Sequence, residues 1–192
     1  MKQIYPSYKK DNAAELTRLW VEKMVVGLNL CPFAAPETHR DSVRYAVVDG
    51  SSPEEAIRCF LEEVLLIQES PEKEISTTLV IYPAGQEDFD DFLDLLALAE
   101  ECLEQAGLEG LFQLASFHPQ YLFDGVDESD ITNWTNRAPF PVLHIIREGQ
   151  MGRILSSYKS PEEIPEQNML LMTELGREGL IKRFPLFAEY CL

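Results

Sequence analysis

Residues 76–107 read STTLVIYPAGQEDFDDFLDLLALAEECLEQAG, and this stretch decides the fold class. Residues 76–85 form a short apolar run with few polar breaks, which predicts a strand covered on both faces. Residues 87–107 have apolar positions at helical spacing, acidic residues in the first turn and Gly107 at the end, which predicts an amphipathic helix. A buried strand that leads directly into a helix is typical of α/β proteins.

The same alternation extends in both directions along the chain. The other expected elements are a helix over 12–30, a strand over 42–50, a helix over 51–70, a strand over 111–119, a short helix over 129–136, a strand over 141–148 and helices over the remainder. We therefore expect one α/β domain over residues 1–192, with about four strands in a single sheet and helices packed on it. The direction of the fourth strand stays open, so that the sheet is either parallel or mixed.

One helix start is marked by a recognised sequence signature. In SSPEEAIRCF, Ser52 is suited to cap the helix, Pro53 to occupy its first position, and Glu55 to complete a capping box. We therefore expect this helix to begin at residue 53.

The charge and the cysteine pattern exclude several classes of protein. The formal net charge is −17, from 33 acidic and 16 basic residues, and such a field repels nucleic acids and anionic membrane surfaces. No apolar run approaches the roughly 18 residues that span a bilayer, and the first residues lack a hydrophobic signal core, so that a cytoplasmic protein is expected. The four cysteines include no CxxC pair and are expected to be free thiols. The oligomeric state is left open.

The stretch FHPQYLFDG (117–125) carries the first candidate catalytic group. His118 directly follows a predicted strand, and in open α/β sheets ligands collect at the carboxyl ends of strands. Imidazole titrates near neutral pH, so His118 is a candidate acid or base, with Tyr121 as a candidate for binding substrate. The alternative is a loop histidine whose ring caps a carbonyl group.

Two similar stretches, NLCPF (29–33) and NRAPF (136–140), follow predicted helices. In the first, Cys31 is a candidate nucleophile, although the end of a helix opposes ionisation of a thiol, and the alternative is a small buried side chain that lines a pocket.

The second stretch carries the candidate anion clamp. Arg137 with Asn136 is suited to hold a carboxylate or phosphate, and Arg40 would join them if the two stretches met. Arg137 comes near His118 only if the fourth strand runs antiparallel to the third. A single site that contains Cys31, His118 and Arg137 therefore requires a mixed sheet.

His144 lies within the predicted strand PVLHIIRE (141–148). A histidine there is more often a hydrogen-bonded core residue than a ligand. His118, His144 and Asp124 are weak candidates for metal binding, because the sequence has no HxH, HExxH or paired-cysteine spacing. No cofactor is indicated by any motif.

The combination of GLNLCPFA, FHPQYLFDG and TNRAPFPVLHIIRE resembles a bacterial family known as a domain of unknown function, number 1415. The resemblance covers nearly the whole chain and implies no activity, cofactor or catalytic residue. It leaves the candidates to be judged by their own chemistry.

Three functional hypotheses follow from these residues. The first is a small enzyme that acts on a polar or anionic metabolite, with His118 as the acid or base, Arg137 and Asn136 as the anion clamp, and Cys31 close by. The second is a non-catalytic acidic module that binds a basic protein partner, and the third is a metal-dependent hydrolase. The enzyme hypothesis requires a concave site with at least two of Cys31, His118 and Arg137.

Overall fold

A computed structural model describes residues 10–48 and 51–190. Its four-stranded sheet has the order β1-β2-β4-β3. The strands are β1 (Val43–Val47), β2 (Thr77–Ile81), β3 (Phe112–Phe117) and β4 (Val142–Arg147). β1 and β2 are parallel, whereas β4 runs antiparallel to both of its neighbours. The predicted α/β fold class is confirmed, and the sheet is mixed.

Helices precede, connect and follow the strands along the chain. They are η1 (Lys10–Asn12), α1 (Ala13–Trp20), η2 (Val21–Val26), α2 (Ala34–His39), α3 (Pro53–Glu69), α4 (Phe89–Gln105), η3 (Ile131–Thr135), α5 (Glu148–Leu155), η4 (Pro161–Glu163), α6 (Ile164–Arg183) and α7 (Phe187–Tyr190). η1, η3 and η4 are 3₁₀-helices, whereas η2 is a π-helix that continues directly from α1.

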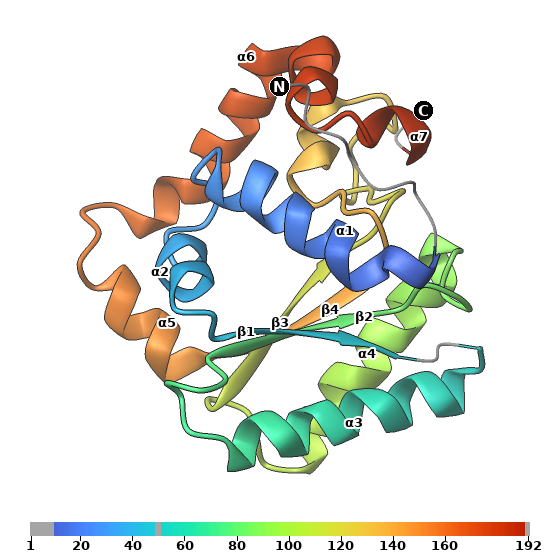
Figure 1. Cartoon of the computed structure of the whole chain (residues 1–192), viewed down its shortest axis with the longest axis vertical. Helices are drawn as coiled ribbons and strands as arrows, with labels where there is room; N and C mark the ends of the chain where they lie inside the picture. Colours follow the sequence, from blue (N-terminus) through green and yellow to red (C-terminus); the bar gives the residue numbers. More distant parts are fainter. Residues whose placement is uncertain (1–9, 49–50, 191–192) are drawn as a thin grey trace.

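Helices cover both faces of the sheet (Figure 1). α3 and α4 pack on one face, through a core that includes Phe60, Phe92 and Leu143. α1, η2 and the C-terminal helices form the other layer, with a core that includes Trp20 and Trp134. All residues of β2 are buried, as its apolar sequence predicts.

The predicted start of α3 is confirmed. The Ser52 side chain accepts a hydrogen bond from the Glu55 N–H, and Pro53 is the first helical residue. α4 begins in the same way, since the Asp88 carboxylate accepts the N–H groups of Asp90 and Asp91. A side-chain oxygen at either position satisfies N–H groups that the helix itself leaves without partners.

The first helix differs from the prediction for residues 12–30. It widens into the π-helix η2, in which the N–H of Gly27 bonds to the Glu22 carbonyl five residues earlier. Asn29 then adopts a left-handed conformation with φ of 55° and ends the helical run. The short helix α2 was not predicted, because its six residues are too few to show apolar periodicity.

α6 is two helical segments joined by a kink at Gly176. Its φ of 58° and ψ of 176° lie in a region that only glycine adopts without strain. The kink turns the last part of α6 along η3, on the same side of the sheet as α1.

Gly27 gives a test of the tight junction after η2. A Cβ atom at this position would lie 2.4 Å from the Lys23 carbonyl oxygen and 2.9 Å from Arg183 Nη1. We expect Gly27→Ala to lower the free energy of unfolding by about 1–3 kcal/mol in urea titrations, because the backbone must shift to remove the overlap. The control is Gly152→Ala in α5, where nothing lies within 4 Å of the added methyl group and helix propensity favours alanine. Equal stability of the two variants would contradict this prediction.

Candidate functional site

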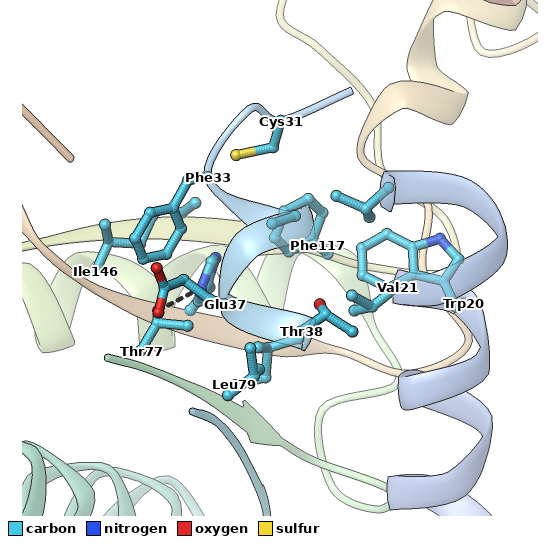
Figure 2. A pocket seen from close by; sticks show the side chains of 15 residues that line it. Trp20, Val21, Cys31, Phe33, Glu37, Thr38, Thr77, Leu79, Phe117 and Ile146 are labelled. Atoms are coloured by element: carbon cyan, nitrogen blue, oxygen red, sulfur yellow. Dashed lines mark hydrogen bonds between the residues drawn. The ribbon is translucent and has the colours of Figure 1, made fainter. Parts of the chain in front are cut away.

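A cavity of about 130 Å³ lies between the sheet and the layer formed by α1, η2 and α2. Figure 2 shows its walls, with side chains from both layers around one space. The apolar part of the wall includes Trp20, Val21, Val25, Phe33, Leu79, Phe117 and Ile146. The groups of chemical interest in the wall are Cys31, Glu37, Thr38, Thr77 and His144.

The sheet register explains why the cavity forms at this point. His144 of β4 lies between Leu79 of β2 and Ala115 of β3 in neighbouring strands. Directly paired side chains project from the same face, and Ala115 is small. The alanine leaves unfilled space beside the imidazole ring, which the helical layer then encloses.

The hydrogen bonds of His144 fix its tautomer. Thr77 Oγ1 lies 2.6 Å from the Ile145 carbonyl oxygen and 2.6 Å from His144 Nε2. The carbonyl accepts only, so the hydroxyl donates to it, and Nε2 must carry the proton that it donates to Thr77. Nδ1 is then the acceptor atom of the ring, and among the described residues it has no hydrogen-bond partner. Burial lowers the pKa of His144 to about 4, so the ring is neutral at pH 7.

Glu37 contributes a carboxylate that is only 2% exposed. It accepts hydrogen bonds from Ser42 Oγ at 2.7 Å and from Arg40 Nη1 at 2.6 Å. Arg40 was predicted to bind an anionic substrate, but its guanidinium here neutralises Glu37. A buried carboxylate needs such a partner, because desolvation disfavours an isolated charge.

Cys31 lies in the cavity wall, between the end of η2 and the start of α2. Burial raises the pKa of its thiol, and the N–H groups of Phe33 and Ala34 offset only part of this effect. No hydrogen bond links its sulfur to His144 or Glu37 in the described structure. The thiol form is therefore favoured, as the wall-residue interpretation of Cys31 requires.

Thr38 adds a second polar atom without a partner. Its Oγ1 is buried and forms no hydrogen bond with any described residue. A buried hydroxyl without a partner is unfavourable by about 1–3 kcal/mol.

His118 lies on the opposite face of the sheet from the cavity and is 0% exposed. Its ring packs against Phe89 and Phe92 of α4, with centroids 5.1 and 5.3 Å apart. Nδ1 accepts the N–H of Gln120, so Nε2 carries the proton and donates to the Gln86 carbonyl at 3.1 Å. This geometry is that of a histidine that ties two loops together, and the acid or base role of His118 stays a prediction.

The antiparallel direction of β4 does bring the stretch NRAPF (136–140) close to His118. The His118 N–H donates to the Asn136 carbonyl oxygen at 3.2 Å. The Asn136 amide donates to the Ser116 carbonyl, and the Tyr121 ring packs between Phe89 and Phe123. These contacts order the loop after β3.

The mixed sheet nevertheless does not bring Cys31, His118 and Arg137 into one site. The cavity that contains Cys31 includes neither His118 nor Arg137 in its wall, and Arg137 lines a separate hollow. The weak metal candidates are also apart, since His118 and His144 face opposite sides of the sheet and Asp124 is exposed. Within residues 10–48 and 51–190, no three His, Cys, Asp or Glu side chains are placed to hold a metal ion together.

Comparison with known proteins gives one match. A family model described as "protein of unknown function (DUF1415)" matches residues 12–182. The chain belongs to this family. Searches of curated proteins and of solved structures found no match. Among the described helices, none combines the length and apolar character needed to cross a membrane.

The depressed pKa of His144 makes stability depend on pH. In the unfolded chain the imidazole titrates near its ordinary value of 6.5, and in the folded protein near 4. As the pH falls from 6.5 towards 4, the unfolded state binds the proton first, so the free energy of unfolding decreases by about 2–3 kcal/mol from this group. We expect urea titrations at several pH values to show this loss in the wild type and a smaller loss in His144→Asn. The control is His39→Asn, which removes an exposed histidine and retains the His144 contribution. A slope unchanged in His144→Asn would reject the assignment.

Proposed function

We propose that the protein binds a small, mainly apolar molecule carrying a hydroxyl group, in the cavity between the sheet and α1, η2 and α2. The observation that carries this proposal is an enclosing wall that is almost entirely apolar and in which His144 Nδ1 has no hydrogen-bond partner among the described residues. A hydroxyl group can donate a hydrogen bond, so it suits the acceptor nitrogen of His144.

The size of the cavity limits the ligand. About 130 Å³ is close to the roughly 150 Å³ of an apolar cavity that accommodates benzene. A ring of that size with one polar substituent fits the volume, whereas a nucleotide or a sugar phosphate does not.

The electrostatics of the cavity point in the same direction. Glu37 carries a negative charge that Arg40 balances, so an anionic ligand gains no cation there. Neutral ligands are therefore favoured over the anionic metabolites that the sequence predicted.

Binding is better supported than catalysis by the same residues. A general base works best when its pKa lies near the operating pH, and the His144 pKa of about 4 is far below it. Cys31 lacks the base or cation that activates a nucleophilic thiol. The predicted enzyme that uses His118 stays a prediction, and the proposed site uses His144 to recognise a ligand.

The three stretches that carry the family resemblance all contribute to this cavity. Cys31 and Phe33 come from the first, Phe117 from the second, and His144 with Ile146 from the third. Segments that lie far apart in the sequence thus form one wall.

Phenol and benzene serve as probes, because they differ by the hydroxyl group alone. We expect saturable binding of both, measured by calorimetry and by the fluorescence of Trp20 in a Trp134→Phe background. Phenol should bind about five- to tenfold more tightly, since one hydrogen bond contributes about 1 kcal/mol.

Two variants separate the polar from the apolar contribution. His144→Phe should abolish the preference for phenol, and Ala115→Leu should fill the cavity and weaken both probes. His118→Asn, on the other face of the sheet, should leave the preference intact. Equal affinity of the wild type for the two probes, or no saturation with either, would reject the proposal.

A further inference from the structure

A second hollow lies away from the cavity, where η3 meets the last part of α6. It has a volume of about 470 Å³ and is lined by Asp127, Glu128, Ser129, Trp134, Arg137 and Arg177. It is open to solvent on one side, and its polar lining differs from the apolar wall around Cys31. Any ligand of this hollow is therefore independent of the ligand proposed above.

Arg137 is the main reason to expect a ligand here. Its side chain belongs to a residue that is only 7% exposed, and its charge forms no ion pair with any described carboxylate. Nε donates to the Tyr121 carbonyl and Nη2 to the Glu128 carbonyl, each at 3.3 Å. Nη1 has no partner among the described residues, and the guanidinium borders the hollow. A buried cation with only two long hydrogen bonds is expensive to maintain without a counter-charge.

Other arginines of this chain show how such a charge is usually balanced. Arg44 pairs with Glu63, and Arg153 pairs with Glu72. Arg147 is partly buried but donates to the Ile67 and Ser70 carbonyls at the end of α3, where the helix dipole is negative. The two carbonyls that Arg137 contacts belong to a loop, which provides no comparable field.

Arg177 places a second guanidinium at the same hollow. The guanidinium carbons of Arg137 and Arg177 lie 5.9 and 5.8 Å from the centre of the Trp134 ring. Both are within the range of cation–π attraction, and the kink at Gly176 directly precedes Arg177. Both arginines line the hollow, so an anion bound there is attracted by two cations.

The carboxylates of the hollow restrict the kind of anion. Asp127 accepts the N–H and the hydroxyl of Ser129 within its own turn, and Glu128 is exposed. Their negative charges disfavour a dianion more strongly than a monoanion. The planar fork of an arginine matches the two oxygens of a carboxylate.

We propose that this hollow binds the carboxylate group of a small monoanionic molecule, with Arg137 as the buried donor, Arg177 as the exposed donor and Trp134 as the aromatic part of the wall. The guanidinium Nη1 of Arg137 donates to the ligand, and Arg177 supplies the second cation. The site requires no change in the sheet or in the cavity.

Acetate is the probe for this site. Sodium acetate replaces sodium chloride at constant ionic strength, while NMR follows the Arg137 Nε–H and the Trp134 indole N–H of the full chain. We expect saturable shifts of both signals with acetate. Inorganic phosphate near pH 7.5, where it is mainly a dianion, should bind more weakly.

Two exposed arginines provide the matched variants. Arg177→Gln removes one donor from an exposed position and should weaken acetate at least about tenfold. Arg153→Gln removes an equal charge from an exposed ion pair with Glu72 elsewhere and should leave the affinity unchanged. Arg137→Lys keeps the buried charge, loses the fork and should also weaken acetate. Shifts that do not saturate, equal affinity in Arg177→Gln and wild type, or tighter binding of phosphate than of acetate would each overturn the proposal.

Discussion

The reversed strand β4, which lies between β2 and β3, sets the arrangement of His118, Asn136 and His144. Its hydrogen bonds to both neighbours fix the register that places His144 between Leu79 and Ala115. The same reversal delivers the chain before β4 to the end of β3, where the Asn136 carbonyl accepts the His118 N–H. Side chains alternate along a strand, so His118 and His144 project from opposite faces. The register of β4 thus brings His144 into the cavity wall, and side-chain alternation places His118 on the other face.

The sequence predicts the elements whose signals are local. The start of α3 depends on Ser52, Pro53 and Glu55, which are adjacent in the chain, and β2 is recognisable because it is apolar throughout. The direction of β4 depends instead on how a long connection, residues 118–141, folds back. No local pattern encodes that choice, so the sequence alone permits either a parallel or a mixed sheet.

The candidate site was only partly predictable, for related reasons. Cys31 was expected in a pocket wall or at a reactive centre, and it lies in a wall. His144 was interpreted as a hydrogen-bonded core residue, and its bond to Thr77 has that character. Glu37 and Thr38 were missed because they belong to α2, which is too short to detect. The sequence favours His118 as a site residue because ligands collect at the ends of strands. That rule concerns where the backbone lies and does not give the direction of a side chain. The His118 ring points into the core and packs against Phe92 of α4.

The π-helix η2 has a kinetic consequence. Val21 and Val25 of this segment form part of the cavity wall, so a molecule can pass there only when the turn opens. π-helical turns are short and rare interruptions of α-helices, and local opening of such a turn requires less free energy than global unfolding. Exchange of a bound molecule through this part of the wall therefore depends on the opening rate of one helical turn and does not require the sheet to unfold.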